Sequence, residues 1–200
     1  MFFSLVRFLI GALVFIGIYI VIKAKKGRRR LKTAVTLLIA IAFSCFMSYI
    51  PFENQFVTFS SVESAYKYYS NENKNIEVVV SGENCDLIIG KDDAFSYYIF
   101  PKNEDGWKIG IHSLCNVEYF SSSDYSADKI QYKSMDEGFI VVYDHGRDLR
   151  LEFSDVYNTS FECKKIDRVN VYYAFIPCFD SEYQLYVNGE KVDFGNFDVW

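Results

Sequence analysis

Asp144 and His145 are adjacent in the sequence, and a carboxylate beside an imidazole can act as a general base. The run FIVVYDH, however, predicts a strand over residues 139–145, where neighbouring side chains point to opposite faces. Asp144 would then not orient His145, which we interpret as a residue at a strand end or turn. The chain has one other histidine, His112, and no GxSxG, HExxH or phosphate-binding motif. We therefore expect no enzymatic activity and no cofactor.

Two acidic turns offer the oxygen ligands that calcium prefers. They are Asp92-Asp93 and Asn103-Glu104-Asp105. Neither has the spacing of an EF-hand loop, and acidic turns are common on solvated surfaces. We expect no metal site at either turn.

Four cysteines lie beyond residue 50: Cys85, Cys115, Cys163 and Cys178. An oxidising compartment would permit disulfides among them, in three alternative pairings. Pairing Cys85 with Cys115 and Cys163 with Cys178 would keep each bridge within one predicted domain. The alternative is that these cysteines are small buried hydrophobic residues. No pair has CxxC spacing, which argues against a zinc site or a thioredoxin-like redox motif.

The chain is rich in aromatic residues, with 16 tyrosines and 19 phenylalanines. Tyrosine doublets occur at Tyr97-Tyr98 and Tyr172-Tyr173, where one ring would face the core and the other the surface. An exposed row of tyrosines could bind a glycan or a protein of the cell envelope, because the ring combines apolar area with a polar tip. The alternative is that tyrosine is present as a good strand former.

The first 50 residues differ sharply from the rest in charge. They contain eight Lys or Arg and no acidic residue, whereas the remainder has all 26 acidic residues and 13 basic ones, a net charge of −13. Apolar runs at about residues 2–22 and 33–50 come close, at about 1.5 Å per helical residue, to the thickness of a hydrocarbon core. We predict a transmembrane helical hairpin at residues 1–50. No small-residue cleavage site follows the first run, so we expect no cleaved signal peptide.

The loop between these runs, residues 23–32, sets the predicted orientation. Its seven basic residues are Lys23, Lys25, Lys26, Arg28, Arg29, Arg30 and Lys32. The positive-inside rule places this loop in the cytoplasm, so both termini lie outside it; Arg7 alone favours the opposite topology. We expect a cell-membrane protein crossing the lipid bilayer twice. No cluster of Lys and Arg follows residue 50, which argues against a nucleic-acid partner.

The exposed region is predicted to be mainly β. Ser60 and Glu63 have the spacing of a capping box, which predicts a short helix over residues 61–70. Runs of β-branched and aromatic residues then predict an antiparallel meander with strands at 76–81, 85–91, 95–100 and 107–112. Together these elements form a predicted domain at residues 51–120.

The loop-like stretch SSSDYSA, residues 121–127, is the predicted boundary to a second domain at residues 121–200. Asn188-Gly189 is the strongest hairpin signal in the chain. Strands are predicted at 129–134, 139–145, 149–154, 168–176 and 183–187. This spacing favours a small β-sandwich, with an immunoglobulin-like layout as one form of it. A single continuous sandwich over residues 75–200 is the alternative architecture.

The stretches PFENQFVTFSSVESAYKYY, from Pro51 to Tyr69, and FSYYIFPKNEDGWKIG, from Phe95 to Gly110, carry a family resemblance. They resemble a group of uncharacterised small membrane proteins of Gram-positive bacteria that have N-terminal membrane helices and an exported β-rich region. The resemblance implies an exported, membrane-tethered domain. It implies no activity and no catalytic residues.

These features favour a membrane-anchored extracytoplasmic binding or interaction module without enzymatic activity. One alternative is an accessory subunit of a larger membrane complex, contacted through the hairpin. The other alternative is a cell-envelope enzyme that uses Asp144, His145 or the acidic turns.

Overall fold

The computed structural model describes residues 2–25, 39, 41–42, 54, 57–70, 75–91, 94–109, 115–132, 135–145, 150–180 and 182–196 of the 200-residue chain. The chain divides into two compact units. One comprises Met1–Val57 with Lys67–Glu72, and the other comprises Thr58–Tyr66 with Asn73–Trp200. Each unit is described by itself.

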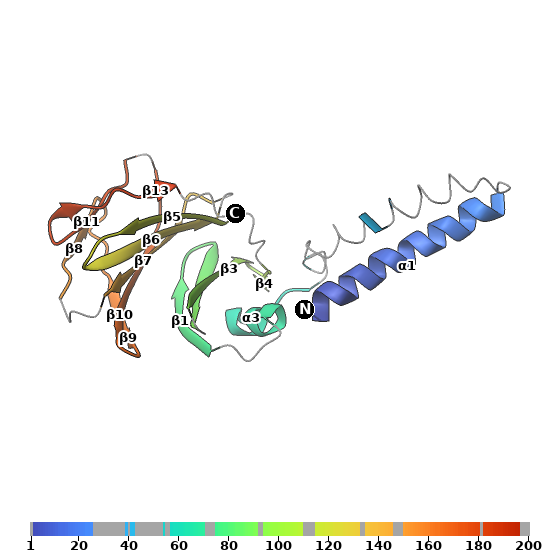
Figure 1. Ribbon diagram of the computed structural model, residues 1–200, viewed down its shortest axis with the longest axis horizontal. Coiled ribbons are helices and arrows are strands. Elements are labelled where there is room, and N and C mark those ends of the chain that lie inside the picture. Colours follow the sequence, from blue (N-terminus) through green and yellow to red (C-terminus); the bar gives the residue numbers. More distant parts are fainter. Residues whose placement is uncertain are drawn as a thin grey trace. The chain divides into compact units, whose positions relative to one another are not determined.

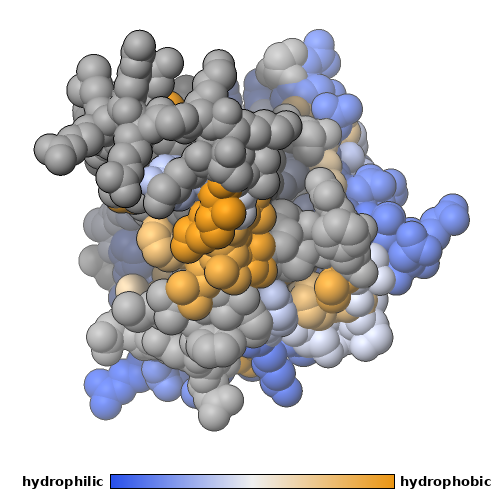
Figure 2. Space-filling view, turned by 90° about the vertical axis from the view of Figure 1, so that its right-hand side faces the viewer, coloured by the Kyte–Doolittle hydropathy of each residue, from blue (hydrophilic) through white to orange (hydrophobic). Residues whose placement is uncertain are grey.

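The first unit contains helix α1, Phe2–Lys25, whose sequence is apolar from residue 8 to residue 22. Its exposed hydrophobic side chains include Leu13, Ile16 and Ile20, and such side chains gather at the centre of the face that Figure 2 shows. Within the described part of the chain, no helix is both long enough and apolar enough to cross a membrane. Residues 26–32, and residues 33–50 apart from 39, 41 and 42, lie outside the described residues, so the hairpin stays a prediction.

The structure confirms the predicted short helix as α3, Val62–Ser70, which begins one residue later than predicted and is capped by a different serine. The hydroxyl oxygen of Ser61, not Ser60, accepts a hydrogen bond of 3.2 Å from the backbone N–H of Ser64. A serine side chain in this position satisfies one of the free N–H groups of the first turn.

The second unit is built from antiparallel sheets (Figure 1). A four-stranded meander has the order β1-β2-β3-β4, with β1 (Asn75–Ser81), β2 (Cys85–Lys91), β3 (Phe95–Asn103) and β4 (Gly106–Trp107). A six-stranded sheet, curled into a half-barrel, has the order β13-β5-β6-β7-β10-β9, with β5 (Cys115–Ser121), β6 (Tyr125–Tyr132), β7 (Gly138–Asp144), β9 (Glu162–Ile166), β10 (Val169–Ile176) and β13 (Gly195–Asn196). A small sheet has the order β12-β11-β8, with β8 (Phe153–Asp155), β11 (Leu185–Val187) and β12 (Glu190–Lys191).

Three hydrophobic cores join these elements in layers. Val62, Ala65 and Tyr66 of α3 pack on one face of the meander. The other face of the meander packs on the half-barrel through residues such as Leu87 and Phe139. The opposite face of the half-barrel packs on the small sheet in a core that includes Ile140, Ile176, Leu185 and Val187. The half-barrel is therefore an internal layer, which explains why every residue of β7 is buried.

The structure confirms most of the predicted strands, including β2, which has the predicted bounds. Of the predicted strand at 107–112, Trp107 lies in β4, whereas residues 108–109 are outside any strand, so the prediction is wrong there; residues 110–112 lie outside the described residues. The predicted loop at 121–127 is mostly strand, since only residues 122–124 form the turn between β5 and β6. Strands β5, β9 and β13 are not predicted by the sequence patterns considered above.

Candidate functional site

Asp144 and His145 are not assembled as a catalytic dyad. Asp144 is fully buried at the end of β7, where its carboxylate accepts a hydrogen bond of 2.9 Å from the side-chain amide of Asn170 on β10. The ring of His145 is exposed and lies 3.3 Å from the hydroxyl of Ser126 on β6. The two side chains thus bond to strands on opposite sides of β7. His112 lies outside the described residues.

Of the two acidic turns, only Asn103-Glu104-Asp105 lies among the residues that can be described. Asp92-Asp93 lies outside those residues. In the other turn, the Asn103 side-chain oxygen accepts a bond of 3.1 Å from the N–H of Asp105, as in a local turn between β3 and β4. Over the described part of the chain, no group of three or more His, Cys, Asp or Glu is arranged to hold a metal ion.

None of the four cysteines is in a disulfide in the structure, so the Cys85–Cys115 and Cys163–Cys178 bridges are not formed. Cys163 on β9 is exposed, whereas Cys85 at the start of β2 is fully buried. The Cys85 thiol donates a hydrogen bond of 3.3 Å to the carboxylate of Glu137. Burial, and then the bond to Glu137, raise the pKa of Cys85 well above its ordinary value. Such a thiol is held as a neutral donor and is a poor nucleophile.

Glu137 connects the meander to the half-barrel. It is only 4 % exposed and lies just before β7. Its two carboxylate oxygens accept bonds from the backbone N–H groups of Glu83 (3.2 Å) and Asn84 (2.7 Å) and from the Asn84 side chain (3.2 Å), in addition to the Cys85 thiol. These donors form the turn between β1 and β2, so we interpret Glu137 as a structural anchor for that turn.

A second buried network joins the same two layers. The Tyr97 hydroxyl on β3 donates to Asp128 on β6 and is hydrogen-bonded to the Tyr143 hydroxyl on β7. Burial raises the pKa of Asp128, and the Tyr97 hydrogen bond lowers it to a smaller extent. Burial likewise raises the pKa of Tyr97 and of Tyr143. A hydroxyl held between a buried carboxylate and a second hydroxyl, each from a different strand, has the properties of a structural link.

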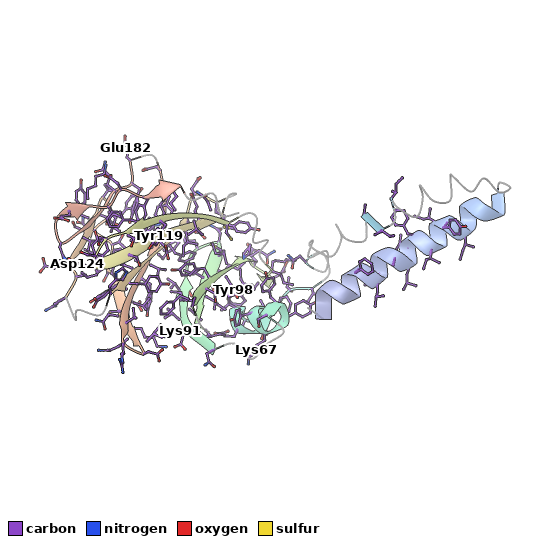
Figure 3. All side chains as sticks on the ribbon, viewed as in Figure 1. Lys67, Lys91, Tyr98, Tyr119, Asp124 and Glu182 are labelled. Carbon is purple, nitrogen blue, oxygen red and sulfur yellow. The ribbon has the colours of Figure 1, made fainter. Side chains whose placement is uncertain are left out.

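The predicted tyrosine doublets do not form an exposed row. Tyr97 packs between the meander and the half-barrel, and Tyr98, labelled in Figure 3, packs toward α3 with its ring centroid 5.1 Å from that of Tyr66. Tyr172 and Tyr173 likewise pack into the cores on the two faces of the half-barrel. The expectation of one outward ring per doublet is wrong, because both sheets are covered on both faces.

Aromatic rings gather at a different place, between the segment after β8 and the segment before β11. The rings of Tyr157 and Tyr183 are stacked, with centroids 6.2 Å apart and an interplanar angle of 24°. The ring of Phe179 meets Tyr183 edge-on at 4.8 Å. Two carboxylates, Asp155 and Asp180, complete what we call the Tyr157 surface. Glu182, labelled in Figure 3, marks the outer loop that carries Asp180 and Tyr183.

The carboxylates hold this arrangement in place. Asp155, only 8 % exposed, accepts bonds from the backbone N–H groups of Tyr157 (3.1 Å) and Thr159 (2.8 Å) and from the Tyr183 hydroxyl (3.4 Å). Asp180 accepts a bond of 3.3 Å from the Tyr157 hydroxyl. Desolvation, followed by the charge of Asp180, raises the pKa of Tyr157 to about 12. Both phenols therefore remain neutral near pH 7, and each combines a ring face with a fixed polar group.

The Tyr157 surface has the chemistry of a binding site. The Tyr157 side chain is 38 % exposed and its neighbour Val156 is 53 % exposed, so apolar area is open to solvent beside charged oxygens. Phe179 makes a cation–π contact within the protein, because the Lys129 ammonium lies over its ring, 5.0 Å from the centroid. This surface is not evident in the sequence, because its residues come from two segments that are separated along the chain. The one local signal is Asp155 two residues before Tyr157, a spacing that is typical of a side-chain-to-backbone turn.

Comparison with known proteins gives no guide to the ligand. No family model matches the chain, no curated protein matches it, and no solved structure matches it.

Proposed function

We propose that the protein is a membrane-anchored, extracytoplasmic binding module without enzymatic activity, and that the Tyr157 surface is where it binds. The observation that carries the proposal is the open stack of Tyr157 and Tyr183 beside two carboxylates. Exposed rings contribute apolar contact area at a low entropic cost, and the oxygens fix the orientation of a polar ligand. A glycan or a protein of the cell envelope fits this chemistry.

The anchor and orientation are part of the proposal. The apolar sequence of α1 and the apolar run at 33–50 support a two-helix hairpin, and seven basic residues between them support a cytoplasmic loop. The resemblance to exported proteins of Gram-positive bacteria is consistent with this placement. A small sandwich with an immunoglobulin-like layout is the finer fold that we propose for residues 121–200, on the support of the small sheet packed against the half-barrel.

Labelling of Cys163 tests the orientation directly, because this thiol is exposed. A membrane-impermeant maleimide added to intact cells should label the wild-type chain, and Cys163→Ser should abolish most of the signal. Labelling that requires lysis of the cells would show that residues 51–200 are cytoplasmic.

Crosslinking in intact cells followed by mass spectrometry tests the binding surface. The double variant Tyr157→Ala/Asp180→Ala should lose a partner that the wild type captures, because truncation of an aromatic hot spot typically costs about 2 kcal/mol or more. Tyr119→Ala is the matched control, since Tyr119 is 36 % exposed on β5 and lies outside the Tyr157 surface. Equal capture by the double variant and the control would reject this surface.

A second candidate function is that of an accessory subunit bound through the hairpin. The apolar side chains exposed along α1 favour it. Replacement of residues 1–50 by an unrelated hairpin separates the two functions. Retained capture supports the binding module, and lost capture supports the accessory subunit.

A further inference from the structure

A groove of about 380 Å³ lies along the side of the second unit, where the meander meets the half-barrel. It is lined by residues 79–81 of β1, by residues 173–175 of β10, by Glu162 at the start of β9 and by Ser160 just before that strand. The groove shares no residue with the Tyr157 surface. The groove exists because β9 does not extend along the whole length of β10. The ladder between β9 and β10 ends at the pair Tyr173 and Glu162, while β10 continues to Ile176.

The hairpin geometry determines which backbone groups of β1 face this groove. The N–H of Gly82 donates to the carbonyl of Cys85, so these residues flank a two-residue turn and form a hydrogen-bonded pair. Hydrogen-bonded pairs recur at every second residue, so Val80 and Val78 direct their peptide groups toward β2. Val79 and Ser81 therefore direct their N–H and C=O groups away from β2, to the free edge of the meander.

The same reasoning applies to β10. The two-residue turn 167–168 makes Ile166 and Val169 a hydrogen-bonded pair, so Val171, Tyr173 and then Phe175 direct their peptide groups toward β9. In this register Ser160 would stand opposite Phe175, but residue 160 is not part of a strand. Within the described residues, Phe175 therefore has no partner in β9, and its peptide groups face the groove.

The free edge of β1 is blocked at one end and open at the other. The Lys164 ammonium on β9 donates to the carbonyl oxygen of Glu77. The lysine side chain therefore covers the free edge at the first residues of β1. A lysine in this position is a common protection against unwanted strand pairing. No such group covers residues 79–81 among the residues that can be described, where the edge meets the groove instead.

We propose that this groove accepts an extended segment of a partner protein, which adds to the meander as a strand beside β1. Peptide donors and acceptors that alternate along a strand edge are complementary to another peptide backbone, and this is how β-augmentation gains its affinity. The half-buried rings of Tyr173 and Phe175 form an apolar floor for alternate side chains of the added segment. Glu162 is the charged side chain in the described lining, so the segment carries a Lys or Arg that reaches it.

Val79→Pro is the variant that isolates the strand edge. Proline removes the N–H that faces the groove, while the bonds of Val78 and Val80 to β2 remain, and edge positions tolerate proline. Val79→Thr is the matched control, because it alters the side chain and keeps the N–H. Tyr157→Ala is a second control, which leaves the groove intact and shows that the two sites fail independently.

The experiment selects binders from a phage-displayed library of random peptides on the full-length protein. We expect enriched peptides that contain a basic residue, that bind Val79→Pro about tenfold or more weakly, and that bind Val79→Thr and Tyr157→Ala as they bind wild type. Amide hydrogen exchange should be fast at Val79 and Ser81 in the free protein and slow when the peptide is bound. This readout decides the matter if Val79→Pro does not fold. No enriched peptide, equal binding to Val79→Pro, or unchanged exchange at Val79 and Ser81 would overturn the proposal.

Discussion

Removal of the Glu137 carboxylate should be among the most damaging single changes to the fold. The side chain is 4 % exposed and accepts four hydrogen bonds from the turn between β1 and β2, the shortest being 2.7 Å from the Asn84 N–H. Bonds to a charged group are worth about 1.5–3 kcal/mol when a partner is removed. Glu83 and Asn84 are exposed, so water replaces part of what they lose. Glu137→Ala should therefore lower the free energy of unfolding by about 2–4 kcal/mol.

Urea denaturation followed by tryptophan fluorescence measures this difference, because Trp107 is bonded at 2.7 Å to the buried Asp86 of the same meander. Asp136→Ala is the matched control. Its side chain is adjacent and exposed, so the cost should stay within about 0.5 kcal/mol. Glu137→Gln keeps an acceptor oxygen and should lie between the two. A cost for Glu137→Ala as small as that of Asp136→Ala would refute the view that this carboxylate holds the two layers together.

Three further predictions concern the interior. Burial raises the pKa of Asp128 above its ordinary value of 3.8, so the folded state binds the proton more tightly and stability falls as pH rises through the raised pKa. Asp128→Asn should therefore gain stability relative to wild type between pH 4 and pH 7, as measured by urea denaturation at each pH, and a constant difference would contradict this. Cys85 should react with iodoacetamide at least about tenfold more slowly than Cys163, because the Cys85 thiol is buried and its pKa is raised. Mass spectrometry of the alkylated peptides measures the two rates. Gly138→Ala should cost about 1–3 kcal/mol in the same denaturation assay, because a Cβ there would lie 2.5 Å from the Phe179 ring.

The central strands were predictable because their sequences are dominated by apolar residues. Ile88 and Val141 lie in runs that are covered on both faces, and such runs stand out from a single sequence. β9 was missed for the opposite reason. Its sequence ECKKI is exposed along four of five residues, so it lacks any apolar pattern and is defined only by its ladder to β10. Lysine on such an edge strand is a feature of sheets that avoid aggregation.

The aromatic doublets illustrate what a single sequence cannot decide. Alternation correctly predicts that Tyr97 and Tyr98 point to opposite faces, but it does not show whether a layer covers each face. In the structure α3 covers one face and the half-barrel covers the other, so neither ring belongs to an open surface. The Tyr157 surface had no counterpart in the pattern, because Asp155 and Tyr183 are brought together only by the pairing of β8 with β11.

Several of the acidic residues are buried and contribute to the packing of the fold. The net charge of −13 on residues 51–200 does not show where the carboxylates lie. Five of those in the described region are at most 8 % exposed: Asp86, Asp128, Glu137, Asp144 and Asp155. Each accepts at least one hydrogen bond from another part of the fold. Buried charges of this kind are destabilising without their donors and therefore favour one arrangement of the layers over others. Part of the acidic excess thus specifies the packing of the β-layers, and the part that remains exposed, such as Asp180, is what a partner can meet.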